Sequence, residues 1–170
     1  AVASLKKGRR IEELEQFALN DSMTGFYNRN AYDYFIYNEK NIKNYMVVTF
    51  DLNNLKMCND NYGHSSGDAY IIHSAHIIET TFDRFGKCYR IGGDEFCCLI
   101  PDAAEFQIER FIQKMQQDIA ILNNKNIIPT EVGIACGYAL ATPDDADIEK
   151  VRERADEMMY HNKKVLKGLI

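Results

Sequence analysis

The sequence is poor in several features that mark particular classes of protein. No apolar run approaches the roughly 18 residues that a membrane-spanning helix needs. The charged start of the chain, residues 1–10, has no apolar signal-peptide core. Only three prolines occur, and there is no internal repeat or low-complexity tract, so we expect no linker within residues 20–165. The chain begins with Ala1 rather than Met, and we expect it to be a piece of a longer protein.

Cysteine and histidine are too few and too irregularly spaced for a disulfide framework or a zinc site. The five cysteines are an odd number, two of them are adjacent, and none forms a C-x-x-C pair. We therefore expect buried, reduced thiols in a cytoplasmic protein. His73 and His76 are one helical turn apart and could share a face, but zinc would need two more ligands nearby.

The sequence also has fewer basic than acidic residues, which limits the binding partners that can be expected. The chain has 20 Lys and Arg against 25 Asp and Glu, a formal net charge of −5. Domains that grip a nucleic-acid polymer are usually basic, so we expect no such partner. One small phosphorylated ligand needs only a local positive site and stays possible. The length of 170 residues, with 46% hydrophobic residues, fits a single globular domain with a short extension.

Hydrophobic periodicity predicts an α+β chain. The expected elements are helices at 11–19 and 29–39, a strand at 45–52, a turn-rich stretch at 53–67, a helix from 68, strands at 88–91 and 96–100, a helix around 108–122, a strand at 132–140 and a last helix from about 144 towards 164. Without the N-terminal helices the order is β-α-β-β-α-β, the ferredoxin-like arrangement.

This topology brings acidic residues together at one edge of the sheet. Right-handed crossovers place the third strand between the first two, so the end of the first strand lies beside the hairpin that follows the second. Asp51 is at the first place, and Asp94 and Glu95 are at the second. Gly92 and Gly93 predict a tight hairpin, since both glycines can adopt positive φ angles.

Three acidic groups on a rigid edge require positive charge among them. Oxygen ligands of this kind suit Mg²⁺ or Mn²⁺, whose remaining ligands are substrate phosphates and water. Lys56 is a candidate phosphate contact. Asn59 and Asp68, with His64 between them, carry an amide and a carboxylate that together can read a guanine edge. Residues 63–67 lead into a helix N-terminus, which favours anions.

The residue types alone leave a plain structural reading open. Asp51 could simply cap the end of a strand, and Gly92-Gly93-Asp94-Glu95 could be an ordinary hairpin with a solvated tip.

Four blocks of sequence, in the same order, resemble the GGDEF family, the diguanylate cyclases. Residues 90–96 (RIGGDEF) resemble the family's name-giving motif, and residues 21–29 (DSMTGFYNR) resemble its opening D-x-L-T-G-L-x-N-R. Residues 50–68 resemble its central block, and residues 155–163 resemble its closing helix. The resemblance extends over about residues 10–168.

The resemblance implies an enzyme that condenses two GTP into cyclic di-GMP and two pyrophosphates. Two copies of the domain face each other, each holding one GTP, and each 3′-hydroxyl attacks the other α-phosphate. It also implies a nucleotidyl-cyclase-like antiparallel sheet flanked by helices. Residues 20–170 would be the catalytic domain, and residues 1–19 would be a connector helix from an upstream sensor domain in a cytoplasmic or membrane-anchored parent protein.

Roles in metal binding and catalysis follow from matching positions. Asp51, Asp94 and the backbone carbonyl of Leu52 would hold Mg²⁺ or Mn²⁺. Asp94 would also accept the proton of the 3′-hydroxyl. Lys56 would stabilise charge on the transferring phosphate, and Glu95 would be a further acidic partner.

The resemblance assigns a second set of residues to the substrate. These are Asn59 and Asp68 for guanine, His64 close to the substrate, Gly92 and Gly93 for backbone approach to the nucleotide, and Lys163 and Lys167 for the terminal phosphates. In the opening block, Thr24, Asn28 and Arg29 are expected to fix a turn rather than to react.

The sequence departs from the family pattern at three places. Asn53 replaces a frequent second acid. Lys167 stands where the family often has arginine, and a lysine offers phosphate a point charge in place of a bidentate fork. Asp83 and Gly86 occupy the positions of the family's inhibitory Arg-x-x-Asp site, so we expect no feedback inhibition there. A non-catalytic sensor of GTP or cyclic di-GMP, and a cyclase with altered base choice, are the alternatives. The intact hairpin acids disfavour the first and Asp68 disfavours the second.

Overall fold

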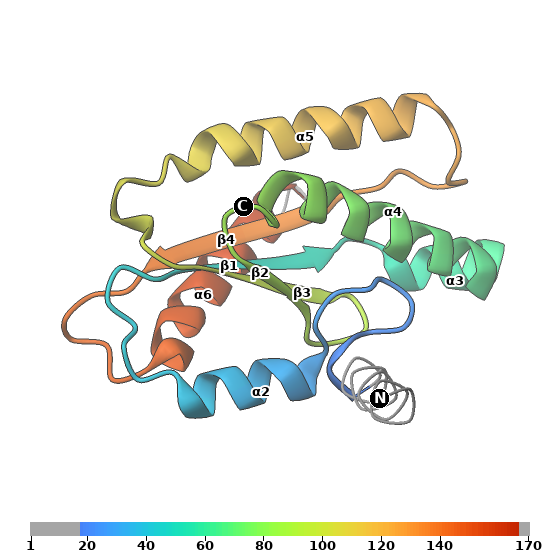
Figure 1. The fold of residues 1–170 in the computed structure, drawn as a ribbon. Coiled ribbons are helices and arrows are strands. Elements are labelled where there is room, and N and C mark those ends of the chain that lie inside the picture. The colour runs from blue at the N-terminus through green and yellow to red at the C-terminus, as the bar shows by residue number, and fades with distance from the viewer. Residues whose placement is uncertain (1–17, 167–170) are drawn as a thin grey trace, which may run out of the picture.

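The computed structural model describes residues 18–166, which form one sheet with helices on both of its faces (Figure 1). The elements are α2 (Arg29–Asn38), β1 (Met46–Leu52), α3 (Leu55–Tyr62), α4 (His64–Phe82), β2 (Lys87–Arg90), β3 (Glu95–Ile100), η1 (Ala103–Glu105), α5 (Ile108–Asn124), β4 (Ile134–Leu140) and α6 (Ile148–Leu166). Most of the helix expected at 11–19, and Lys167, lie outside the described residues.

The sheet has the order β2-β3-β1-β4, and neighbouring strands are antiparallel. This is the ferredoxin-like arrangement, and it confirms that the third strand lies between the first two. All seven residues of β1 are buried, as befits a central strand with helices on both faces.

Side chains of β1 alternate between two hydrophobic clusters. Val48 and Phe50 pack with residues of α4 and α5 on one face of the sheet. Val47 packs with residues of α2 and α6 on the other face. Because successive side chains of a strand point to opposite faces, one apolar strand supplies both layers of the core. All five cysteines are buried in the interior as free thiols.

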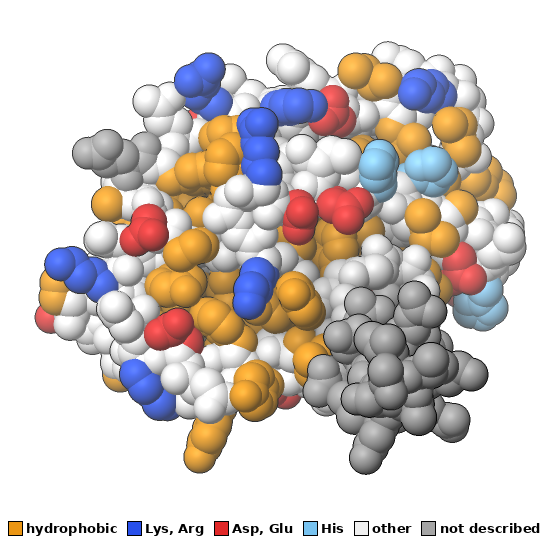
Figure 2. All heavy atoms as spheres, viewed as in Figure 1, with side chains coloured by type: hydrophobic (Ala, Val, Ile, Leu, Met, Phe, Trp, Pro, Cys, Tyr) orange, Lys and Arg blue, Asp and Glu red, His pale blue; other side chains and the backbone are white. Residues whose placement is uncertain are grey.

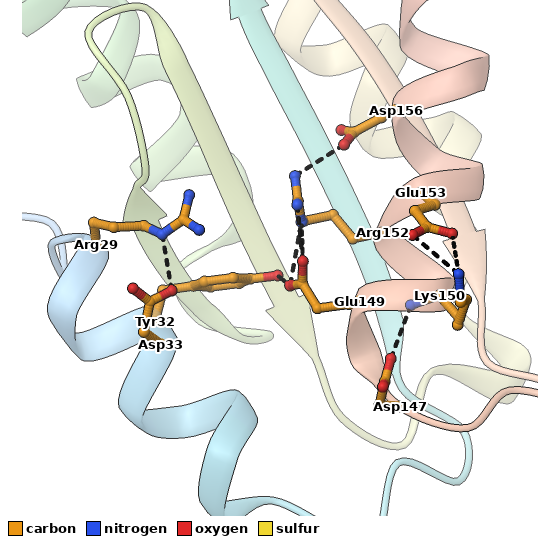
Figure 3. A network of polar contacts seen from close by, with 9 residues as sticks. All are labelled: Arg29, Tyr32, Asp33, Asp147, Glu149, Lys150, Arg152, Glu153 and Asp156. Carbon is orange, nitrogen blue, oxygen red and sulfur yellow. Dashed lines mark hydrogen bonds and ion pairs between the residues drawn. The ribbon is translucent and has the colours of Figure 1, made fainter.

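A polar network ties α2 to α6 beneath the sheet (Figure 3). The hydroxyl of the buried Tyr32 donates a hydrogen bond of 2.6 Å to Glu149. Arg152 pairs with the same Glu149 at 2.8 Å and with Asp156 at 2.9 Å. The network joins the two helices on the face of the sheet opposite α4 and α5.

The segment predicted to be turn-rich is helical, and this prediction was wrong. α3 occupies Leu55–Tyr62, and α4 begins at His64 rather than at residue 68. Gly63, with a φ of 84°, forms the corner between the two helices. α3 buries only Leu55 and Cys58, so its apolar stripe was too short to be read among Asn and Asp residues.

Two further expectations need correction. Gly92 and Gly93 are not among the residues with positive φ, so the hairpin turns without the left-handed conformation that we expected. The last helix begins at Ile148 rather than near residue 144, because Asp145 accepts hydrogen bonds from Thr142 in a turn ahead of it. Within residues 18–166, no helix has both the length and the apolar character that crossing a membrane would take.

Candidate active site

The end of β1 and the β2–β3 hairpin meet at one edge of the sheet, as the topology predicts. Asp51 is the register partner of Glu95, and the amide of Leu52 donates a hydrogen bond of 3.0 Å to the carbonyl of Asp94. Asp51 is 9% exposed, Asp94 is half-buried and Glu95 is exposed. Three carboxylates therefore belong to one small, rigid piece of sheet.

Lys163 supplies positive charge to this edge. Its Nζ atom lies 2.5 Å from Oδ1 of Asp51. The neighbouring Asn162 donates a hydrogen bond of 2.8 Å to the carbonyl of Cys136 and so attaches the last turns of α6 to β4. The lysine is thus held in the place where a partly buried carboxylate needs a cation.

A cavity of about 460 Å³ opens beside the acidic edge. Its lining brings together the acid, basic and backbone groups assigned to metal and phosphate: Leu52, Lys56, Asp94 and Lys163. Asn54, Leu55, Met57, Asp60 and Asn61 complete the wall. Two lysines that face one carboxylate-lined cavity suit a ligand that carries several phosphates and a divalent cation.

The candidate guanine-reading residues lie on α3 and α4. The side chain of Asn59 rests on Gly67, where an added Cβ would come within 2.0 Å of Asn59 Oδ1. Asp68 follows directly on α4 and is exposed, as is His64 at the start of that helix. Glycine at position 67 therefore allows the amide to lie against α4 beside Asp68. None of these three polar residues lines the 460 Å³ cavity.

The two glycines of the hairpin differ in their surroundings. A Cβ at Gly93 would meet nothing within 4 Å, so this backbone is open to an approaching molecule. A Cβ at Gly92 would lie 2.7 Å from the flexible carboxylate of Glu95. The amides of Ile91 and Gly92 both donate to the carbonyl of Glu95 and close the turn.

Arg90 braces the hairpin from the side, a role that the sequence reasoning missed. It donates a hydrogen bond of 2.7 Å to the carbonyl of Gly93 and pairs with Asp21 at 3.1 Å. Burial raises the pKa of Asp21, but hydrogen bonds from Thr24 and Arg90 outweigh burial and lower this pKa overall. The presence of Arg90 in the hairpin block and of Asp21 in the opening block was the available signal.

Two of the three residues expected to fix local structure in the opening block make contacts of that kind. Thr24 bonds to Asp21, and the side chain of Asn28 caps α2 by accepting from the amide of Ala31 at 3.0 Å. Arg29 instead forms an exposed pair with Asp33 on its own helix, so the expectation that it fixes the turn was wrong.

A divalent cation is compatible with the residues at the acidic edge. Among residues 18–166 there is no cluster of three or more His, Cys, Asp or Glu side chains that could hold a metal by themselves. Mg²⁺ commonly uses one or two protein carboxylates and takes its other ligands from phosphates and water. Asp51 and Asp94 meet that requirement, and the cationic head of Lys163 beside Asp51 shows that the carboxylate accepts a positive partner.

Charges on the visible face are mixed rather than separated by sign. Figure 2 shows acidic and basic side chains intermingled over the described surface in view. A broad basic stripe is typical of proteins that bind a nucleic-acid polymer, and this face does not present one.

Comparison with known proteins identifies the family. The family model described as diguanylate cyclase, GGDEF domain, matches residues 18–167. Diguanylate cyclase DgcN of Escherichia coli is 31% identical over 89% of this chain and 38% of its own length. DgcS of Shewanella oneidensis is 26% identical over 94% of the chain and 54% of its own length. The chain thus spans about a third to a half of these relatives.

The fold agrees with this family. The coiled-coil and GGDEF domain of DgcB from Caulobacter crescentus, solved in complex with cyclic di-GMP, has a TM-score of 0.82. It is 22% identical in sequence, and the match covers 96% of this chain and 90% of that one. The sequence match and the shared fold together place this chain in the GGDEF family of diguanylate cyclase domains.

Proposed function

We propose that this domain is an active diguanylate cyclase, which condenses two GTP into cyclic di-GMP and two pyrophosphates. The observation that carries the proposal is the convergence of Asp94, Lys56 and Lys163 on one cavity at the acidic edge, with Asp51 paired to Lys163. Phosphoryl transfer is catalysed mainly by positioning and by neutralising charge, and this set of groups supplies both.

The reaction divides into two equivalent phosphoryl transfers. In each, a 3′-hydroxyl oxygen bonds to the α-phosphorus of the other GTP, the bond from that phosphorus to the bridging oxygen breaks, and pyrophosphate leaves. Asp94 accepts the hydroxyl proton, and Lys56 stabilises the charge on the transferring phosphate. Glu95, next to Asp94 on the hairpin, adds negative charge at the same edge.

Mg²⁺ or Mn²⁺ is the cofactor in this proposal. Asp51, Asp94 and the carbonyl of Leu52 would hold it, and it would neutralise the phosphate oxygens and polarise the α-phosphate. When the metal binds, Lys163 would leave Asp51 and contact the terminal phosphates, as Lys167 would. This exchange gives the lysine one partner in each state of the site.

In this proposal, residues of α3 and α4 select the guanine base of the substrate. Asn59 and Asp68 offer an acceptor pair and a donor that match the guanine edge, and His64 stands close by at the start of α4. Gly92 and Gly93 let the hairpin backbone approach the nucleotide. Retention of Asp68 favours GTP over ATP and disfavours a mixed dinucleotide as product.

Catalysis requires a second copy of the domain, because each copy holds only one GTP. We assign residues 20–170 to the catalytic domain and residues 1–19 to a connector from an upstream sensor domain that brings two copies together. The chain matches only part of its curated relatives, which leaves room for such a domain. GTP as substrate places the reaction in the cytoplasm.

The second candidate function is a domain that binds GTP or cyclic di-GMP without turnover. The observation that favours it is the Lys163–Asp51 pair, which already neutralises one candidate metal ligand. The two functions separate when a wild-type domain fused to a dimeric coiled coil is incubated with GTP and Mg²⁺ and the product is identified by mass. A cyclase yields cyclic di-GMP, and its Asp94→Ala variant yields none. A sensor binds nucleotide and leaves GTP unchanged.

A further inference from the structure

Tyr70 is a buried tyrosine of α4 whose hydroxyl group contacts the chain just after β1 and just before β4. It belongs to α4 and is fully buried. Its hydroxyl lies 2.7 Å from the carbonyl oxygen of Asn53 and accepts a hydrogen bond of 2.7 Å from the amide of Gly133. The carbonyl of Gly133 is further away, at 3.1 Å. Since a hydroxyl has one proton, the shorter contact defines its donor bond, to Asn53.

The residue that accepts this bond sits at a critical corner of the chain. Asn53 directly follows Asp51 and Leu52, and its amide donates to the carbonyl of Gly133 at 2.8 Å. The next residue, Asn54, has a φ of 60° and occupies the N-cap position of α3, where its side chain makes no capping hydrogen bond. A left-handed residue other than glycine costs energy and depends on its surroundings to persist. The Tyr70 hydroxyl and Gly133 hold the residue just before it.

The corner connects groups with different proposed roles. On one side of Asn53 is the end of β1, with Asp51 and the Leu52 carbonyl for the metal. On the other side is α3, with Lys56 for phosphate. Tyr70 itself lies two residues after Asp68, the candidate guanine reader on α4. One hydroxyl therefore fixes the metal-binding strand relative to the helix that reads the base.

We propose that Tyr70 is a positioning residue for the metal–triphosphate site, and this inference rests on the proposed cyclase function. The hydroxyl acts through Asn53 and touches neither substrate nor metal. Removing it leaves a buried carbonyl without its donor, so the corner relaxes and the Leu52 carbonyl and Asp51 shift. The side chain of Asn59 lies against Gly67 of α4, so we expect Asn59 and Asp68 to keep their positions for guanine when the corner relaxes.

The test compares two variants that each lose one buried tyrosine hydroxyl. Tyr70→Phe removes the hydroxyl that is hydrogen-bonded to Asn53 and Gly133. Tyr32→Phe removes the 2.6 Å hydrogen bond to Glu149 on the opposite face of the sheet. We expect Tyr70→Phe to lower kcat about tenfold, in line with the cost of small misplacements in a reacting complex. We expect its KM for GTP at saturating Mg²⁺ to change less than about twofold. Tyr32→Phe should leave both constants near their wild-type values.

A binding measurement separates this inference from the proposed function. GTP lacking its 3′-hydroxyl binds but cannot react, so its binding can be titrated at rising Mg²⁺. Tyr70→Phe should need about fivefold more Mg²⁺ for half-maximal binding than the wild type or Tyr32→Phe. An unchanged Mg²⁺ requirement would overturn the positioning role, even if the variant melts at a lower temperature. A wild type that binds this analogue but makes no product from GTP would contradict the proposed function and not this comparison.

Discussion

Lys163 on α6 donates a hydrogen bond of 2.5 Å to Asp51 on β1, across 112 positions of sequence. Both side chains are largely shielded, with exposed fractions of 24% for the lysine and 13% for the aspartate. The pair joins a candidate phosphate-binding residue to a candidate metal-binding residue. Under the proposed function, metal and triphosphate would have to separate two groups that neutralise each other.

Replacing Lys163 should change the affinities for metal and for nucleotide in opposite directions. Lys163→Met removes the cation that competes at Asp51, so Mn²⁺ alone should bind about fivefold more tightly, as expected for a pair that contributes about 1 kcal/mol. The unreactive 3′-deoxy-GTP should bind about tenfold more weakly at saturating Mg²⁺, because a phosphate contact is lost. Electron paramagnetic resonance of Mn²⁺ and calorimetry of the nucleotide measure the two effects.

The neighbouring lysine provides the control. Lys164 lies over the ring of Tyr160 at 4.3 Å and outside the cavity, so Lys164→Met should leave both affinities unchanged. If Lys163→Met weakens Mn²⁺ and nucleotide together, the lysine does not compete with metal at Asp51.

A methyl group at position 67 should disturb base recognition. In Gly67→Ala the new Cβ would overlap Asn59 Oδ1, at 2.0 Å, and displace the amide. Loss of one hydrogen bond to guanine should raise KM for GTP about tenfold, with a smaller change in kcat. Ser65→Ala, a change at an exposed position two residues earlier on α4, is the matched control. Steady-state rates over a range of GTP decide the matter, and an unchanged KM in Gly67→Ala would argue against Asn59 as a guanine contact.

The turn before α6 should make stability depend on pH. The hydrogen bond from Arg154 is the largest influence on Asp145, and despite partial burial it lowers the pKa of that carboxyl to about 2. Because the ordinary pKa is 3.8, the stabilisation is fully present above about pH 4 and is lost as pH falls through about 2. Asp145→Asn should lower the unfolding free energy by roughly 1 to 2 kcal/mol at pH 7, and by less at pH 2.

Denaturant unfolding at several pH values measures this difference. The exposed neighbour offers a control, since Asp144→Asn should alter stability little at any pH. A difference between Asp145→Asn and the wild type that stays constant from pH 7 to pH 2 would mean that the carboxylate charge is not the source of the effect.

Feedback through the family's inhibitory site should be absent. Asp83 is the C-cap residue of α4. An added Cβ at Gly86 would lie 2.2 Å from the carbonyl oxygen of Leu99, so an acidic side chain has no room there. Cyclic di-GMP in excess should leave the initial rate at saturating GTP unchanged. Equilibrium dialysis should find no pool of bound product that GTP fails to displace, and finding such a pool would refute the expectation.

Much of the fold was predictable because it follows from periodic apolar segments. The strand at 45–52 and the two short strands around Gly92 fixed the topology, and with it the meeting of Asp51 and the hairpin acids. The helix at Leu55–Tyr62 was not predictable, since only Leu55 and Cys58 mark its buried face. Its stability comes from packing against α4, which local sequence does not report.

Parts of the candidate site were out of reach for the same reason. The proposed roles of Asp51, Asp94 and Lys56 rest on the resemblance of their motif blocks to the family. The pairing of Asp51 with Lys163 and the hydrogen bond from Tyr70 to Asn53 depend on how α4 and α6 lie against the sheet. Tyr70 reads from sequence as one more buried aromatic residue of a helix, because its hydroxyl partners are backbone groups 17 and 63 positions away.

The stoichiometry of the reaction with GTP tests the proposed cyclase activity. The wild-type domain, fused to a dimeric coiled coil, is incubated with GTP and Mg²⁺, and the nucleotides are resolved by mass while pyrophosphate is counted. We expect cyclic di-GMP with two pyrophosphates released per product molecule, and no product from Asp94→Ala. Intact GTP after incubation with the dimerised wild type, or pyrophosphate release without cyclic di-GMP, would contradict this expectation.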